Sequence, residues 1–124
     1  MSANIQLTDS EWRVMRALWD NGPCSLRALC DSLKDTGWSA NAVISFIKRL
    51  EQKGAAGVSG ERRNKLYHAL IERSDATAFE TESLIDRVFG GDMHLMMQTA
   101  VSSRRISDEE ADELIRILQN GRDA

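Results

Sequence analysis

Apolar side chains recur every three or four residues through the first 53 positions, in three stretches separated by Gly22 and Gly37. This spacing predicts three amphipathic helices. The first follows the capping box Thr8–Glu11, the second covers about residues 25–34, and the third runs from the N-cap Ser39 to Lys53. The predicted inward stripes are Trp12, Met15, Leu18 and Trp19, then Leu26, Leu29, Cys30 and Leu33, then Val43, Phe46, Ile47 and Leu50.

The helical spacing fails over residues 55–71. Gly57 and Gly60 interrupt it, and residues 65–71 can alternate between inward and outward positions, which predicts a β-hairpin. Three helices followed by a hairpin is the order of a winged helix-turn-helix domain, whose third helix enters the major groove of DNA. We therefore predict that residues 1–73 form a winged-helix DNA-binding domain.

The outward face of the predicted third helix combines Ile44 with short polar side chains. An exposed isoleucine is unusual on a solvated face, but it suits a face that meets methyl groups and base edges in a DNA groove. Basic side chains on this helix and on the hairpin tip would contact phosphates. The residues predicted to bind DNA on these grounds are Asn41, Ser45, Lys48, Arg49, Arg62, Arg63 and Lys65.

From residue 74 onward the apolar spacing is helical again. It predicts three short amphipathic helices, separated by Gly90-Gly91 and by the capping box Ser107–Glu110. Such helices form only a marginal core by themselves, and closed two-fold dimers are the commonest assembly. We therefore predict a mainly α protein in which residues 74–124 form a helical homodimerisation domain. The predicted dimerisation residues are Leu84, Val88, Phe89, Leu95, Met96, Leu114 and Leu118.

Charge and composition refine this interpretation. The net charge of −3 conceals an asymmetry, because residues 1–73 carry 11 Lys and Arg against 8 Asp and Glu, whereas residues 74–124 carry 5 against 11. A basic DNA-facing module joined to an acidic partner module would have this distribution. No apolar run approaches the ~20 residues of a membrane span, and the N-terminus lacks the pattern of a signal peptide. We expect a cytoplasmic protein without membrane insertion.

The sequence predicts no metal site and no other cofactor. Cys24 and Cys30 lack the spacing of a metal-binding pair, and neither His68 nor His94 completes a metal pattern with them. Cys30 is expected to pack as a small apolar side chain, since reduced cysteines are usual in the cytoplasm.

Several short motifs occur along the chain in a distinctive order. They are Leu7-Thr8-x-x-Glu11-Trp12-x-Val14-Met15, Leu18-Trp19, Trp38-Ser39, Arg49-Leu50-x-x-Lys53-Gly54, Tyr67 and Phe89-Gly90-Gly91-Asp92-Met93. Their order and spacing resemble the penicillinase repressor family of the BlaI/MecI/CopY type over nearly the whole chain. The resemblance implies a dimeric repressor of antibiotic-resistance or copper genes, with an N-terminal winged helix and a C-terminal helical dimerisation module. It adds Ser39, Ala42 and Tyr67 to the predicted DNA-binding residues.

The chain departs from this family pattern in three places. Family recognition helices usually carry a basic residue and threonines where this chain has Asn41, Ala42, Ile44 and Ser45, so the family's usual operator sequence does not carry over. The paired C-x-C clusters of the copper-responsive branch are missing. In the β-lactam branch a membrane sensor's signal leads to cleavage of an Asn-Phe bond in the fifth helix, and the equivalent candidate bond here is Thr99-Ala100.

These observations predict a transcriptional repressor that binds a dyad-symmetric operator in double-stranded DNA as a homodimer. It would control resistance or stress-response genes and be relieved by an inducing signal. Cleavage near Thr99-Ala100, through a membrane sensor or protease of the same pathway, is one route of relief. A ligand or partner that changes the dimer geometry is the other.

Two functions of other classes compete with this prediction. An enzyme is disfavoured because Gly57-Val58-Ser59-Gly60 lacks the spacing of a nucleophile elbow and the carboxylates after Ser107 form a solvated helix face, so we predict no catalytic residues. The second is a winged helix that binds a protein without DNA. The basic tip of the hairpin favours DNA binding over this second alternative, since phosphate contacts need such charges and protein docking does not.

Overall fold

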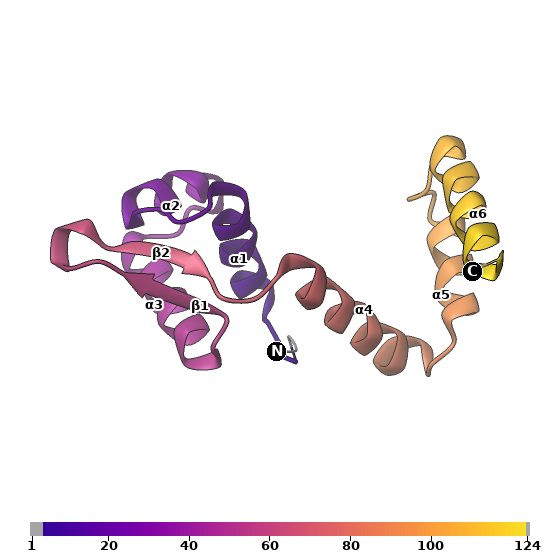
Figure 1. Ribbon diagram of the computed structural model, residues 1–124, viewed down its shortest axis with the longest axis horizontal. Coiled ribbons are helices and arrows are strands. Elements are labelled where there is room, and N and C mark those ends of the chain that lie inside the picture. Colours follow the sequence, from indigo (N-terminus) through magenta and orange to yellow (C-terminus); the bar gives the residue numbers. More distant parts are fainter. Residues whose placement is uncertain (1–3, 124) are drawn as a thin grey trace. The chain divides into compact units, whose positions relative to one another are not determined.

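The computed structural model describes residues 4–123 of the chain, which divides into two compact units, Met1–Thr81 and Glu82–Ala124. Figure 1 labels the main elements. In chain order they are α1 (Asp9–Asn21), α2 (Leu26–Ser32), the 3-10 turn η1 (Lys34–Thr36), α3 (Ala40–Lys53), β1 (Ala56–Ser59), the 3-10 turn η2 (Arg62–Asn64), β2 (Leu66–Ala69), α4 (Arg73–Phe89), α5 (Met93–Ser102) and α6 (Asp108–Asp123).

Side-chain caps fix the starts of the first three helices. The backbone N–H of Thr8 donates to Oε1 of Glu11 at 2.9 Å, and the N–H of Glu11 donates back to the Thr8 hydroxyl at 3.3 Å. The hydroxyl of Ser25 accepts the backbone N–H of Ala28 at 3.1 Å, and the hydroxyl of Ser39 accepts that of Ala42 at 3.1 Å. The predicted helix starts are thereby confirmed, because a cap supplies partners for amide groups that have none inside the helix.

The hydrophobic core of the first unit lies between α1, α2, α3 and the hairpin. α1 contacts α2, α3 and β2, and α3 also contacts β1. The core side chains are those of Leu7, Val14, Met15, Ala17, Leu18, Cys24, Leu29, Leu33, Val43, Ile47, Leu50, Ala55 and Ala56. Trp12, Trp19 and Phe46 were predicted to lie inward, and the structure places them half-buried at the edge of this core.

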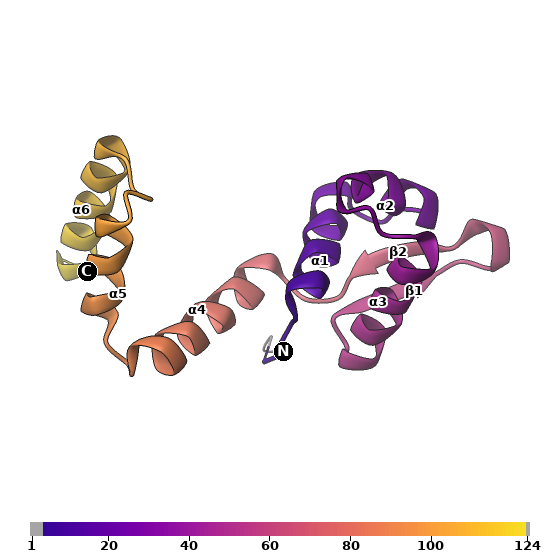
Figure 2. The same ribbon diagram turned by 180° about the vertical axis from the view of Figure 1, so that it is seen from behind.

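The two strands form an antiparallel hairpin with Ala56 opposite Ala69 and Ser59 opposite Leu66. Cys24 extends the sheet by one bridge to Tyr67, with mutual backbone hydrogen bonds of 3.0 and 2.7 Å. Figure 2 shows the hairpin running past α3, with its connecting loop projecting beyond the three helices. Three helices followed by this hairpin confirm the predicted winged helix-turn-helix fold.

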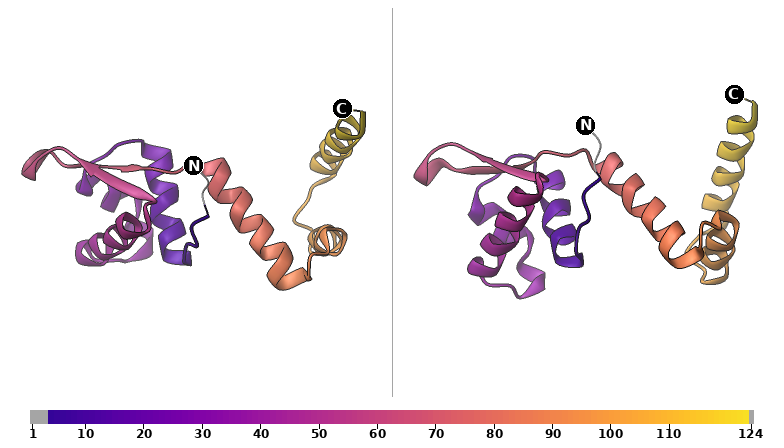
Figure 3. Two further views of the ribbon diagram at one scale, coloured as in Figure 1. Left: turned by 60° about the horizontal axis from the view of Figure 1, so that its bottom comes forward. Right: turned by 90° about the horizontal axis from the view of Figure 1, so that it is seen from below.

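The second unit is helical, as predicted. Asp92 caps α5 by accepting the N–H of Leu95 at 2.9 Å, and Ser107 and Glu110 form the predicted capping box before α6. In Figure 3, α5 is seen nearly along its axis while α6 is seen from the side, so the two helices cross. The domain boundary between residues 73 and 74 stays a prediction.

Burial differs sharply between the two units. The only buried residue of α4 among those described is Ala76, which belongs to the first unit, and no residue of 82–122 is buried. Leu84, Val88 and Leu118, which are among the predicted dimerisation residues, are exposed in the single chain. The second unit therefore has helices without a closed core of its own.

Among the described residues, no helix is long and apolar enough to cross a membrane.

Candidate nucleic-acid interface

Helix α3 presents two faces of different composition. Val43, Ile47 and Leu50 are at most 2% exposed and fix the helix against the core. The opposite face carries Asn41, Ser45 and Lys48 in exposed positions, with Ile44 half-buried beside them. Because the buried stripe fixes the rotation of the helix about its axis, the short polar side chains point outward from a rigid support.

The start of α3 is held by contacts on both sides of its cap. Trp38 donates its backbone N–H to the Thr36 hydroxyl at 3.1 Å, and its ring packs against Phe46 with centroids 4.9 Å apart. The guanidinium carbon of Arg49 lies 5.5 Å from the centre of the Phe46 ring. Phe46 is half-buried at the edge of the core, and its ring contacts Arg49 by a cation–π interaction. Ala42 is half-buried, and its N–H is used by the Ser39 cap.

The hairpin tip carries the other predicted cations. Arg62, Arg63 and Lys65 are all exposed and lie in or beside the turn η2. Tyr67 differs from them, since it is half-buried against the core and its backbone pairs with Cys24. The structure thus brings three cations together on the projecting loop and places Tyr67 in β2, packed against the core.

An ion pair between the buried Glu11 and the partly exposed Lys53 joins α1 to α3, and sequence analysis missed it. Nζ of Lys53 lies 2.5 Å from Oε1 of Glu11 and also donates to the backbone carbonyl of Gln6 at 2.8 Å. Burial by itself would raise the pKa of Glu11, but the hydrogen bonds from Lys53 and Thr8 outweigh it and hold the pKa below its ordinary value. The pair ties the last turn of α3 to the first turn of α1, so α3 is fixed at both ends.

The connection from the hairpin to α4 is also held in place. Nε1 of Trp19 donates to the carbonyl of Ile71 at 3.0 Å, and Arg73 pairs with Asp20 at 3.3 Å while lying over the Trp19 ring. Ala76, in the first turn of α4, is 1% exposed. The start of α4 is therefore packed as part of the first unit.

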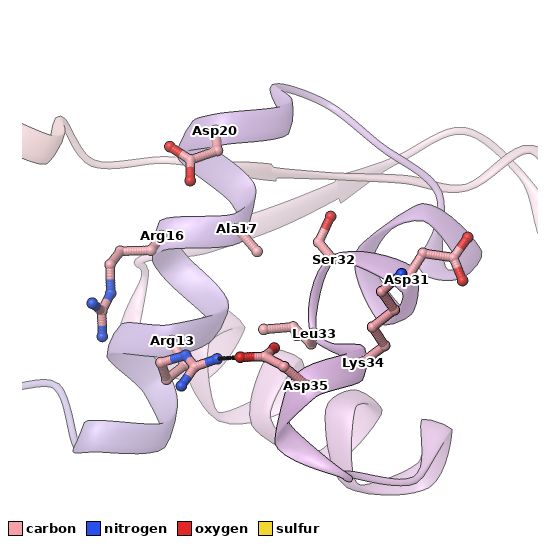
Figure 4. Close-up of a pocket in the computed structure, with 9 residues that line it drawn as sticks. All are labelled: Arg13, Arg16, Ala17, Asp20, Asp31, Ser32, Leu33, Lys34 and Asp35. Carbon is pink, nitrogen blue, oxygen red and sulfur yellow. Dashed lines mark hydrogen bonds and ion pairs between the residues drawn. The ribbon is translucent and has the colours of Figure 1, made fainter.

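An open groove lies between α1 and the segment formed by α2 and η1, but its charges do not suit a polyanion. Figure 4 shows Arg13 reaching across it to Asp35, with which it forms an ion pair of 2.8 Å, while Arg16 points away from α2. Asp20 and Asp31 add two further carboxylates to the lining. Because the cations that line this groove are matched in number by carboxylates, the groove lacks the net basic character of α3 and the hairpin tip.

The two cysteines take no part in this face. Cys24 is buried and Cys30 is half-buried, and burial raises the pKa of both thiols. A raised pKa keeps a thiol protonated at neutral pH and lowers its reactivity. Cys30 packs against the core as predicted.

The structure also locates the residues predicted to act in the C-terminal unit. Of the predicted dimerisation residues, Leu84, Val88, Leu95 and Leu118 are exposed, and Phe89, Met96 and Leu114 are half-buried. Thr99 and Ala100 lie inside α5, where the Thr99 hydroxyl donates to the carbonyl of Leu95 at 2.8 Å. Neither the DNA-binding set nor the dimerisation set is tested by these positions, and both stay predictions.

Comparisons with known proteins identify a family and relatives that match most of the chain. The family model for the penicillinase repressor matches residues 7–120. The penicillinase repressor of Bacillus licheniformis is 28% identical over 115 residues, which cover 92% of this chain and 90% of that protein. The methicillin resistance regulatory protein MecI of Staphylococcus aureus (strain N315) is 26% identical over 116 residues, covering 91% of this chain and 93% of that one.

A solved structure is similar as well. It is the solution structure of the monomeric form of Bacillus licheniformis BlaI in complex with the blaP half-operator. It aligns with a TM-score of 0.53 and 29% identity, covering 60% of this chain and 93% of that chain.

Proposed function

The chain belongs to the penicillinase repressor family, and from this premise we propose that it represses transcription as a homodimer bound to a dyad-symmetric operator in double-stranded DNA. The family is one of transcriptional repressors and not of enzymes. The relative whose structure includes a half-operator supports DNA as the partner of this chain. Such a repressor acts in the cytoplasm, and we assign it resistance or stress-response genes as targets.

The observation that carries the proposal is the outward face of α3. Asn41 and Ser45 are exposed near the capped start of a helix whose rotation is fixed by Val43 and Ile47. Recognition helices of this fold insert their N-terminal residues into the major groove, where short polar side chains hydrogen-bond to base edges. Arg62 and Arg63 on the hairpin tip supply the charge that phosphates or the minor groove require.

A pair of variants separates base contacts from phosphate contacts. In mobility-shift titrations against the DNA upstream of its own gene, Asn41→Ala is expected to weaken binding by about 1–3 kcal/mol and to relax preference at one base pair. Arg62→Ala is expected to weaken specific and mixed-sequence DNA about equally and to lower the salt slope by roughly one unit.

The control is Gln52→Ala, an exposed polar position near the far end of α3, which should bind DNA as the wild type does. Equal losses for Asn41→Ala on specific and mixed-sequence DNA would show that α3 does not read bases. Absence of binding to any DNA would instead favour a winged helix that docks a protein.

For the relief of repression we propose proteolytic cleavage in α5, near Thr99-Ala100. A cut there would separate α6 from the DNA-binding unit and weaken the dimer without touching a DNA contact. The bond lies in a hydrogen-bonded helix, so α5 must open locally before a protease can bind it.

Immunoblots of a protein tagged at its N-terminus, taken before and after induction, are expected to show a fragment that ends near residue 99. If the protein leaves its promoter while remaining full length, cleavage is excluded. A ligand or partner that changes the dimer geometry then accounts for induction.

A further inference from the structure

The loop at the tip of the hairpin is closed into a defined turn. Ser59 and Leu66 form the last pair of the ladder, and six residues connect them. Within this loop the backbone N–H of Asn64 donates to the carbonyl of Glu61 at 2.8 Å and closes the 3-10 turn η2. A loop of this length rich in charged residues could be a mobile coil, but in this loop the backbone at one position lies close to the backbone at the other end of the turn.

That position is Gly60. Its φ is +85°, in the left-handed region that favours glycine, and a Cβ placed there would lie 2.2 Å from the backbone carbonyl oxygen of Asn64. The clash is with backbone, so no rotamer change can relieve it. Only a residue without a side chain lets the chain pass this close beneath the carbonyl of Asn64.

Within this turn, Arg62 has an unusual backbone conformation. Its φ is +40°, one of two positive values among the non-glycine residues described. A side chain held in the left-handed region persists only where the surrounding backbone dictates it. The backbone that carries Arg62 and Arg63 is therefore held in a closed turn.

From this geometry we propose that Gly60 is a positioning residue of the hairpin tip, which closes the loop so that Arg62 and Arg63 are prearranged to contact the phosphates of DNA. The inference rests on the proposed function and deepens it. Prearrangement matters energetically because a mobile loop would have to be ordered on binding, and that ordering would reduce the affinity gained from each arginine.

The test compares Gly60→Ala in the full-length chain with a matched glycine variant, Gly54→Ala. Gly54 has a φ of +81° and nothing within 4 Å of the added Cβ, so its alanine variant meets the same backbone restriction without the clash. Binding to a mixed-sequence 30-base-pair duplex is titrated at several salt concentrations. We expect Gly60→Ala to lower affinity about three- to tenfold and to reduce the salt slope by roughly one to two units, while Gly54→Ala stays within about twofold of the wild type.

A double-mutant cycle shows whether Gly60 acts through the arginines. In a background of Arg62→Ala and Arg63→Ala, adding Gly60→Ala should cause no further loss of affinity. Backbone ¹⁵N relaxation should show residues 61–65 as rigid as the strands in the wild type and mobile in Gly60→Ala.

Each outcome is decisive. The inference is overturned if Gly60→Ala binds as the wild type does, if it loses as much affinity in the arginine-free background, or if the tip is equally mobile in both proteins. A wild-type chain that binds no duplex would refute the proposed function itself. A wild type that binds with an unaffected Gly60→Ala would refute only the role of Gly60.

Discussion

A chain that ends at Thr81 is expected to be monomeric and to bind a full operator on the order of a hundredfold more weakly than the complete chain. Joining two half-site binders converts the second binding event into an intramolecular one, which raises avidity by about 10²–10⁴. Ending the chain at Thr81 keeps Ala76, which is 1% exposed and packed in the first unit, together with the contacts of Trp19 and Arg73. A chain ending at Arg73 would lose Ala76 and could fail for a different reason.

The second unit supplies the physical reason for the proposed dimerisation. No residue of 82–122 is buried in the single chain, and Val88 and Leu118 are 56% and 66% exposed. Apolar area of this kind gains roughly 25 cal/mol for each Å² removed from water, and a second copy offers the same apolar stripes in self-complementary form. The exposed large apolar residues of this unit are Leu84, Val88, Met93, Leu95, Val101, Ile115, Ile117 and Leu118.

Point variants make the same test in the full-length chain. Leu118→Glu should give a species of one-chain mass in sedimentation velocity at micromolar concentration, because a charge would be buried at the interface. Gln119→Glu adds the same charge at the neighbouring exposed position and should leave the dimer intact. If the wild type sediments as a monomer at this concentration, the dimer assignment is wrong.

Helix starts were predictable because their causes are local. Thr8 and Glu11, or Ser107 and Glu110, are three residues apart in sequence and bond to each other in the structure. A pattern of hydroxyl, spacer and carboxylate therefore indicates a helix start without knowledge of the rest of the fold. The hairpin was predictable for a related reason, since the loss of helical spacing and the glycines lie within one short segment.

Features that depend on distant parts of the chain were not predictable. Glu11 already had a local explanation in its capping box, and nothing in the sequence indicates that Lys53, 42 residues away, meets the same carboxylate. Gly60 read as a turn residue, but its close approach to the carbonyl of Asn64 exists only in the folded loop. For the C-terminal helices, periodicity shows which side of each helix is apolar but not what covers that side.

Replacing Lys53 by methionine is expected to destabilise the fold by about 2–4 kcal/mol at pH 7. The Glu11 side chain is 1% exposed, and removing its cation leaves a buried carboxylate without a counter-charge, a loss that typically costs 3–5 kcal/mol. We expect a somewhat smaller loss than this because the Lys53 side chain is 34% exposed and water screens part of the attraction. Urea unfolding followed by circular dichroism measures the change, and Lys34→Met serves as the control for losing an exposed lysine.

The pH dependence of the stability difference between Lys53→Met and the wild type tests whether the buried Glu11 carboxylate causes the destabilisation. In the wild type the folded pKa of Glu11 is lowered from 4.5, so its contribution to stability is complete above pH 4.5 and is lost as the pH falls through the lowered folded pKa. In Lys53→Met, burial without a cation should raise the folded pKa of Glu11, so the variant gains stability relative to the wild type on acidification. The gap between the two proteins should therefore begin to narrow above pH 4.5, as the pH falls through the raised folded pKa of the variant, and narrow further below about pH 4.5, where the wild type loses its own contribution. Adding Glu11→Gln to Lys53→Met should recover part of the loss at pH 7, because the amide keeps an acceptor for Thr8 and carries no charge. A gap that is constant between pH 7 and pH 4, with no recovery in the double variant, would show that packing of the lysine stem and not the buried charge is responsible.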